Sequence, residues 1–296
     1  MKPTQVLVTG ATGFTGAYVV RRLVAAGYDV AVFARSEAKA LQLRDRTGQF
    51  DIFLGDLDDR DSLLRALNGR DILVNVASLG FGHVDCVVSA AEETGVSRLL
   101  AFSSTSIFTT LPAGSKAVRT AAEERIASSS LNWTILRPTM IMGHPGDRNI
   151  IRLIRWIDRH RIVPVFGPGT YGLQPVYVDD LAVAVVAVLA ERRTVRKAYN
   201  LSGRTVLDYN GLVALVAREL DRSPRVLHLP VGLSLAAVRL AALLPGLPRL
   251  SREQVLRLNE DKRFSHEEAT RHFGYSPTPL EDVIRREVQL YRERQD

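Results

Sequence analysis

A glycine-rich stretch near the N-terminus, Thr9–Gly16 with the sequence T-G-A-T-G-F-T-G, constrains the fold of this chain more than any other feature. It directly follows the apolar run Gln5–Val8 and directly precedes a helical pattern from Ala17 to Ala26. The three together predict a strand, a tight turn and a helix. Such a turn can bind phosphate, because the N–H groups of the first helical turn are free and face the anion. The residues expected to contact a pyrophosphate are Gly10, Thr12, Gly13, Phe14 and Gly16.

Short apolar runs alternate with helix-length segments along the first half of the chain. The expected strands are Val30–Phe33, Asp51–Leu54, Ile72–Val76, Leu99–Phe102 and Trp133–Leu136. This alternation predicts an α/β fold with a doubly wound parallel sheet of the Rossmann type, in which ligands bind at the carboxyl ends of the strands. We expect residues 1–145 to form a dinucleotide-binding domain whose sheet is completed by segments near 174–201. Residues 146–296 are expected to form mostly a smaller substrate-binding lobe and the C-terminal helices.

The G-x-x-G-x-x-G spacing resembles the short-chain dehydrogenase/reductase superfamily, in its extended and atypical branches. Three later segments resemble the same superfamily: P-V-Y-V-D-D-L-A at Pro175–Ala182, A-Y-N-L-S-G at Ala198–Gly203 and F-G-Y-S-P-T-P-L at Phe273–Leu280. These branches include NAD(P)-dependent epimerases and dehydratases, NmrA-like redox sensors and an accessory subunit of respiratory complex I. The resemblance implies the Rossmann-type fold and a nicotinamide cofactor, and it says little about the substrate.

Residues that follow the strands are expected to line the cofactor. Arg35 follows the second strand, where an NAD-preferring protein would usually carry an acidic residue, and its guanidinium can pair with a 2′-phosphate instead. The sequence therefore favours NADP over NAD, although an ordinary surface arginine would give the same pattern. The other expected cofactor contacts are Ser36, Asp56, Leu57, Ala77, Ser78, Arg119, Pro138, Thr139 and Met140.

The resemblance implies a catalytic set that this chain carries only in part. Active members use a Tyr-x-x-x-Lys pair, in which the lysine lowers the tyrosine pKa for proton transfer, and a serine or threonine after the fifth strand. The segment F-S-S-T-S supplies that hydroxyl, with Thr105 as the first candidate and Ser104 as the second. Alignment on the E-E dipeptide at 123–124 places Ser115 at the tyrosine position and Arg119 at the lysine position. Arg119 keeps a positive charge that can hold the nicotinamide ribose.

The second half of the chain contains two segments that concern the substrate. A basic helix opens with D-R-N at 147–149, and Arg148, Asn149 and Arg152 are expected to contact the substrate. The nearly apolar run Leu229–Leu247 is shorter than a comfortable bilayer span, so no transmembrane segment is expected. It predicts a helix buried in the lobe or, alternatively, a lid or membrane-surface contact that suits an apolar or phosphate-bearing substrate.

The composition limits the partners. A net charge of +7 and a pI near 9.8 indicate attraction to anions. Phosphates of a cofactor or substrate explain this more simply than nucleic acid, because the arginines are spread over many helices and no nucleic-acid motif is present. The single cysteine, Cys86, and the absence of a signal-peptide pattern favour the cytoplasm. The six histidines show no ligand spacing, so no metal is expected, and the oligomeric state stays open.

Two functions from different classes follow. The first, which we favour, is an NADP-dependent oxidoreductase, epimerase or dehydratase acting on a sugar nucleotide or an isoprenoid-like compound. Without the usual tyrosine it would lose general acid–base help, which contributes roughly 10²–10⁴-fold to rate. The second is an NADP-binding sensor or scaffold that performs no chemistry.

Overall fold

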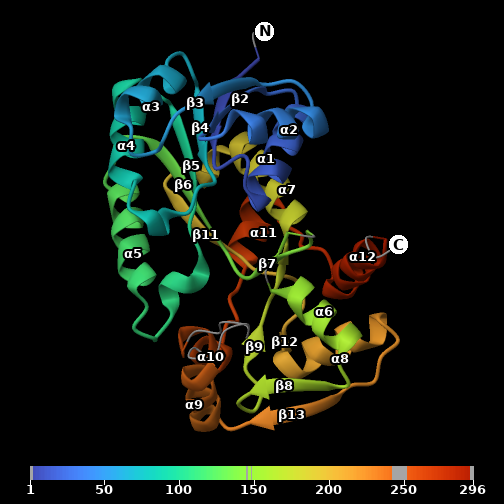
Figure 1. Cartoon of the computed structure of the whole chain (residues 1–296). Coiled ribbons are helices and arrows are strands. Elements are labelled where there is room, and N and C mark those ends of the chain that lie inside the picture. The colour runs from blue at the N-terminus through green and yellow to red at the C-terminus, as the bar shows by residue number, and fades with distance from the viewer. Residues whose placement is uncertain (1–2, 145, 148, 242–251, 294–296) are drawn as a thin grey trace.

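A computed structural model describes residues 3–144, 146–147, 149–241 and 252–293. A seven-stranded sheet lies at its centre, with every strand parallel to its neighbours, in the order β11-β6-β5-β4-β1-β2-β3 (Figure 1). Its strands are β1 (Gln5–Thr9), β2 (Asp29–Ala34), β3 (Asp51–Leu54), β4 (Ile72–Asn75), β5 (Arg98–Phe102), β6 (Asn132–Pro138) and β11 (Lys197–Leu201). All six strands predicted in the first half are present, and the predicted doubly wound α/β fold is confirmed.

Helices cover both faces of this sheet, and each face has its own apolar core. In β1, Val6 and Val8 point into one core and Leu7 into the other, which is why the strand is apolar throughout. The first core includes residues of α1 (Phe14–Ala25), α2 (Glu37–Thr47), α7 (Val178–Ala190) and α11 (Glu267–Phe273). The second includes residues of α3 (Arg60–Leu67), α4 (Val84–Glu93) and α5 (Gly114–Ala127). Short 3₁₀ helices follow β4, β5 and α7: η1 (Leu79–Phe81), η2 (Thr105–Phe108) and η3 (Arg192–Thr194).

A third apolar core lies beyond the carboxyl ends of the strands (Figure 1). It joins α6 (Ile150–Arg159), α8 (Tyr209–Glu219) and α12 (Leu280–Arg292). Around it lie three two-stranded ribbons: β7 (Ile141–Met142) with β10 (Val176–Tyr177), β9 (Gly172–Leu173) with β12 (Leu207–Asp208), and β8 (Ile162–Phe166) with β13 (Arg225–Leu229). The basic helix expected to open at residues 147–149 is α6, which begins at Ile150. It buries its isoleucines and leucine and turns its arginines to solvent.

The last strand of the sheet, β11, is fixed by a buried arginine. Arg98 Nη2 donates to Thr134 Oγ1 at 2.9 Å and to Thr194 Oγ1 at 2.7 Å, and Thr134 Oγ1 donates to the Thr194 carbonyl at 2.7 Å. Burial lowers the pKa of Arg98, and these oxygen acceptors replace the water that would otherwise solvate its guanidinium. The network joins β5 and β6 to the turn that leads into β11.

The apolar run Leu229–Leu247 lies only partly within the described residues. It begins at the end of β13 and continues as α9 (Val231–Ala241), whereas residues 242–247 fall outside the description. After them comes α10 (Arg252–Leu258). Within the described part of the chain, no helix combines the length and apolar character that a bilayer span requires.

Candidate cofactor and substrate site

The glycine turn after β1 packs directly onto the backbone that follows β4. Gly10 has a φ of +66°, and a Cβ there would lie 2.5 Å from the Ala77 nitrogen. A Cβ on Gly16 would overlap the carbonyl oxygen of Gly10. Both positions therefore exclude a side chain. At Gly10 the reasons are the lack of space and the left-handed backbone conformation, and at Gly16 the reason is the lack of space alone. The strand, turn and helix predicted from the sequence are present in that order.

The first turn of α1 is open to an anion. The helix begins at Phe14, three residues before the position that the sequence pattern indicated, and Gly13 is its N-cap. No side chain caps the helix and its first turn holds no acidic residue. Thr12 and Gly13 are exposed. The unpaired N–H groups and the positive end of the helix dipole thus suit a phosphate.

A buried hydrogen-bond chain sets the position of the segment after β4. Thr9 Oγ1 donates to Asn75 Oδ1 at 2.5 Å, and Asn75 Nδ2 donates to the Ala77 carbonyl at 3.3 Å. Ser78 Oγ accepts from the Gly80 N–H at 3.3 Å and begins η1. The segment that holds Ala77 and Ser78 thus starts at the glycine turn, where the Ala77 backbone packs against Gly10, and their contact with a cofactor stays a prediction.

The residues after β2 and β3 differ in how their side chains are engaged. Arg35 is exposed, and none of the described residues forms a hydrogen bond or ion pair with it. Ser36 caps α2 by accepting a backbone N–H at 3.4 Å, and Asp56 Oδ1 accepts the Asp58 N–H at 3.1 Å. Leu57 is half-buried against the core of α3 and α4. Of these side chains, only the Arg35 guanidinium is charged and forms no hydrogen bond or ion pair with a described residue.

The predicted hydroxyls after β5 lie beside the end of β6. Thr105 is 7% exposed and its Oγ1 donates to the Pro138 carbonyl at 3.3 Å. Ser104 Oγ accepts the Ser106 N–H at 3.2 Å, so it caps η2. The hydroxyls of Ser103 and Ser106 are buried and find no hydrogen-bond partner among the described residues.

The segment after β6 is held from two sides. The Thr139 N–H donates to the Leu201 carbonyl at 3.1 Å, and the Val176 N–H donates to the Met140 carbonyl at 2.9 Å. Pro138 ends β6 and Gly10 follows β1, and all strands of the sheet run parallel. Both therefore lie at the same edge of the sheet, where the sequence placed them.

The two residues at the positions of the usual Tyr–Lys pair lie one turn apart on α5. Arg119 Nη1 donates to the Ser115 carbonyl at 3.4 Å. The guanidinium also packs against Gly80, where a Cβ would lie 3.1 Å from Nη2. Burial, followed by the positive charge of Arg257, lowers the pKa of Arg119. The structure thus brings Arg119 to the segment that begins with Ser78, at the carboxyl edge of the sheet.

Glu123, the first residue of the E-E dipeptide used to align α5, forms a partly buried ion pair with Arg137. Arg137 Nε lies 3.0 and 3.1 Å from the two carboxylate oxygens of Glu123. The Arg137 guanidinium also lies over the Phe108 ring, 5.4 Å from its centroid. These contacts fix α5 to β6 and η2, so they fix the direction in which Ser115 and Arg119 face.

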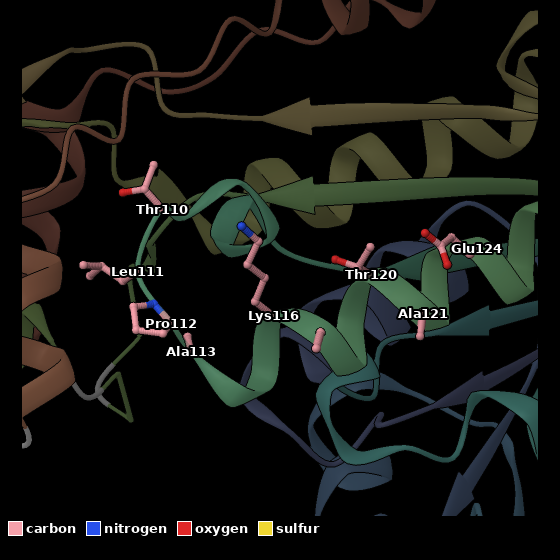
Figure 2. Close-up of a pocket in the computed structure, with 9 residues that line it drawn as sticks. Thr110, Leu111, Pro112, Ala113, Lys116, Thr120, Ala121 and Glu124 are labelled. Atoms are coloured by element: carbon pink, nitrogen blue, oxygen red, sulfur yellow. The ribbon is translucent and has the colours of Figure 1, made fainter.

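A hollow of about 590 Å³ lies beside the loop before α5 and the first half of that helix (Figure 2). Its lining comes from the loop before α5 and from the first half of the helix, including Thr110, Leu111, Lys116, Thr120 and Glu124. Neither Ser115 nor Arg119 lines it. The hollow is therefore separate from the predicted catalytic positions.

The structure describes two of the three substrate residues predicted at the start of α6, and their contact with a substrate stays a prediction. Arg148 lies outside the described residues. Asn149 and Arg152 are both exposed, and Asn149 is the N-cap without a capping side chain. The Asp147 carboxylate caps the helix instead, accepting the N–H groups of Ile150 and Ile151.

A second buried carboxyl group stands next to that cap. Glu287 of α12 is 2% exposed and its Oε1 accepts the Gly143 N–H at 2.9 Å. Burial and the negative charge of Asp147 raise the pKa of Glu287 to about 8. In the loop between β7 and α6, Glu287 thus binds the start at Gly143, and Asp147 binds the end at the first turn of α6.

The segment after α10 crosses to the loop before α5, which the sequence did not indicate. Glu260 accepts from Thr109 Oγ1 at 2.7 Å and from the Thr110 N–H at 2.6 Å. The rings of Phe108 and Phe264 lie 5.6 Å apart. In the sequence, Glu260 belongs to the charged run E-D-K-R, which would ordinarily indicate a solvated loop. No local pattern could have identified its partners 150 residues earlier.

No group of three or more His, Cys, Asp or Glu side chains that could hold a metal occurs among the described residues.

Comparisons with known proteins agree with this geometry. A family profile described as NAD(P)H-binding matches residues 10–155. The 2-alkyl-3-oxoalkanoate reductase of Stenotrophomonas maltophilia is 29% identical, covering 95% of this chain and 98% of that protein. Subunit 9 of the mitochondrial NADH dehydrogenase (ubiquinone) 1 alpha subcomplex of Arabidopsis thaliana is 28% identical over 77% of this chain, and the match spans 61% of that protein.

A solved structure of UDP-glucuronic acid 4-epimerase from Bacillus cereus, in complex with NAD, has a TM-score of 0.79 at 17% identity. The match covers 98% of this chain and 99% of the epimerase. At that identity the likeness concerns the fold, and the fold, the glycine turn and the matched profile point the same way. Residues 10–155 match the NAD(P)H-binding family, and this match, the relatives and the fold together support an extended superfamily like that of the short-chain dehydrogenases/reductases.

Proposed function

We propose that this protein is an atypical NADP-dependent reductase of an apolar carbonyl compound, acting in the cytoplasm without the usual Tyr-x-x-x-Lys pair. The observation that carries the proposal is the packing of the Gly10 turn onto the Ala77 backbone, with the uncapped first turn of α1 beside it. Side chains at Gly10 and Gly16 would collide with neighbouring backbone, so glycines keep the turn tight, and the uncapped N–H groups of α1 are what suit a pyrophosphate. We also propose that residues 1–145 bind the cofactor and that residues 146–296 mostly hold the substrate.

The preference for NADP rests on Arg35. Its guanidinium is exposed at the end of β2 and has no partner among the described residues. The β2 end carries no carboxylate at Ala34, Arg35 or Ser36 that would bind the ribose hydroxyls of NAD.

The choice of an apolar substrate rests on a relative. The Stenotrophomonas protein is matched over nearly its whole length, and its name describes reduction of an alkyl oxo acid. The sequence left a sugar nucleotide and an isoprenoid-like compound open. The relative favours the more apolar of the two.

The chain's own residues would divide the work as follows. A bound nicotinamide cofactor supplies the hydride. Thr105 would donate a hydrogen bond to the substrate oxygen on which negative charge develops. Arg119, charged and half-buried beside Gly80, would hold the ribose hydroxyls. Ser115 lacks a pKa near neutrality, so it would position a proton donor rather than replace the tyrosine.

The experiment is a turnover assay. NADPH consumption would be followed with 3-oxo acids carrying alkyl chains, with simple apolar ketones and with sugar nucleotides. Saturable consumption with the oxo acids supports the proposal, provided that it disappears in Gly13→Asp, which places a carboxylate at the phosphate position. Turnover only with sugar nucleotides would refute the proposed substrate class.

A specific observation supports a second candidate, a non-catalytic NADP-binding scaffold. The tyrosine position holds Ser115, and one relative is a subunit of a respiratory complex. Tight NADPH binding without turnover of any substrate in the panel would favour this alternative.

A further inference from the structure

One stripe on the exposed face of α6 carries arginines and a tryptophan. Positions 155, 156 and 159 lie on one face of the helix, because residues three and four apart in a helix are neighbours. Arg155 and Arg159 are exposed, and neither forms an ion pair with a described residue. Trp156 keeps 37% of its surface exposed. The stripe therefore presents a large amphipathic ring between two positive charges.

The ribbon of β8 and β13 presents an apolar face to solvent. In its parallel register Ile162 is opposite Arg225 and Pro164 is opposite Leu227, so these four side chains lie on the same face. The alternate residue Val163 is buried on the other face, in the third core. Ile162 is 52% exposed and Leu227 is 51% exposed. Two large aliphatic side chains thus stand at the surface with an arginine beside them.

Hydrogen bonds join the stripe to this face. Trp156 Nε1 donates to the Ile162 carbonyl at 2.8 Å, and the Arg225 N–H donates to the Arg161 carbonyl at 2.7 Å. The ribbon lies at the opposite end of the molecule from α2 and β3 (Figure 1). Stripe and ribbon face together form one surface, which we call the basic–apolar patch: Arg155, Trp156, Arg159, Ile162, Arg225 and Leu227.

The positive charge of the patch is not neutralised by the acidic residue of α6. The Asp158 carboxylate accepts from Arg222 Nη2 at 3.0 Å and from the Tyr291 hydroxyl at 2.9 Å, so it is already bound. Arg225 is exposed and forms no ion pair with a described residue. The patch therefore combines apolar side chains with positive charge, and its partner should be both apolar and anionic.

The interface of an anionic bilayer has this combination. Aliphatic side chains enter the boundary between headgroups and acyl chains, tryptophan is enriched at that depth, and guanidinium groups pair with lipid phosphates. Single-stranded nucleic acid is also anionic, but it is bound by several aromatic rings on which bases stack. Trp156 is the one aromatic ring of the patch, whose other apolar groups are aliphatic. The chemistry thus favours lipid.

We propose that the basic–apolar patch docks this protein on the surface of an anionic lipid bilayer, without spanning it. Ile162, Leu227 and the Trp156 indole would enter the interface, and the arginines would meet the phosphates. The inference does not depend on the proposed function, because the patch contains none of the residues assigned to the cofactor or to catalysis.

The experiment is sedimentation of the full chain with two kinds of vesicle. One is phosphatidylcholine alone, and the other is equal parts of phosphatidylcholine and phosphatidylglycerol. We expect binding to the anionic vesicles that weakens as sodium chloride is added, because salt screens the arginines. Binding to phosphatidylcholine alone should be at least tenfold weaker.

Variants of the patch separate the apolar from the electrostatic part. Leu227→Ser and Ile162→Ser should each lower binding to the anionic vesicles about tenfold, because the exposed part of an aliphatic side chain no longer enters the lipid. Arg155→Gln with Arg159→Gln should lower it about fivefold for each charge at low salt.

Two matched controls change the same residue types at the opposite end of the molecule. Leu54→Ser alters a leucine that is 49% exposed at the end of β3. Arg46→Gln with Arg65→Gln removes two exposed positive charges, one from α2 and one from α3. Both controls should bind the anionic vesicles as the wild type does. Unfolding by urea, unchanged from the wild type, shows that each variant is folded.

Equal sedimentation with and without anionic vesicles would overturn the inference, as would vesicle binding that survives in all the patch variants. Light scattering would reveal a different partner: a wild-type dimer that Leu227→Ser dissociates, without vesicle binding, would assign the face to a second copy. Binding of a single-stranded oligonucleotide that the arginine variant loses, again without vesicle binding, would assign it to nucleic acid and overturn the lipid proposal.

Discussion

Replacing Glu287 by glutamine should stabilise this protein, and the gain should grow with pH. The Glu287 carboxyl is buried beside Asp147, and burial with that neighbouring charge raises its pKa from an ordinary 4.5 to about 8. Between these two values the folded protein holds a proton that the unfolded chain has released. Stability therefore falls as pH rises through this window.

The size of the effect follows from the shift. One pKa unit corresponds to about 1.4 kcal/mol, and pH 7 lies about 2.5 units above the ordinary value, so the cost at pH 7 is about 3 kcal/mol. Glutamine has nearly the same shape, keeps an Oε1 to accept the Gly143 N–H, and does not ionise. Glu287→Gln should recover most of that free energy at pH 7 and almost none near pH 4.5.

The measurement is the free energy of unfolding by urea, from pH 4.5 to 8, for the wild type and two variants. The control is Glu124→Gln, which changes an exposed glutamate of α5 and should follow the wild-type curve. Parallel curves for wild type and Glu287→Gln would show that the carboxyl group is not held protonated and would refute this reasoning.

Three further changes test the cofactor site and the substituted pair. Arg35→Ala should lower NADPH affinity about tenfold, to that of NADH, because one charge-assisted pair is lost. Fluorescence titration with both cofactors measures this. Equal affinities for NADPH and NADH in the wild type would contradict the assignment of Arg35 to the 2′-phosphate. Gly16→Ala should lower the free energy of unfolding by about 1–3 kcal/mol, since its Cβ meets backbone that cannot move aside. Gly114→Ala, with nothing within 4 Å, should be neutral in the same denaturation assay. Ser115→Tyr with Arg119→Lys should raise carbonyl reduction up to about 10²-fold, and an inactive double variant that still binds NADPH would favour the scaffold.

The parts of the fold that the sequence predicted well are those encoded by local patterns. The apolar runs predicted the strands from Gln5 onward. The glycine spacing predicted the turn, because any side chain at Gly10 or Gly16 would clash with neighbouring backbone atoms. The order of the strands then placed Ala77 and Pro138 at one edge of the sheet.

The parts that the sequence did not predict depend on contacts between distant residues. Asp147 and Glu287 interact although almost half the chain separates them in sequence, and neither lies in a sequence pattern that predicts the other as its partner. The contact of Glu260 with Thr109 and Thr110 depends on how the last third of the chain packs. A charged run such as E-D-K-R is equally compatible with a fully solvated loop, so this contact had no local signal in the sequence.

Because the strands leave the ribosome in sequence order, β11 also matters for folding during synthesis. It is the last strand of the sheet to be made, and it pairs with β6, which precedes the whole third core. A chain that has emerged only as far as residue 155, where the NAD(P)H-binding profile ends, still pairs β6 with β5 but leaves the other edge of β6 open and Arg98 without the hydroxyl of Thr194. An open apolar edge is a template for association with other chains. We therefore expect a fragment that ends at residue 155 to aggregate, whereas one that includes β11 should not.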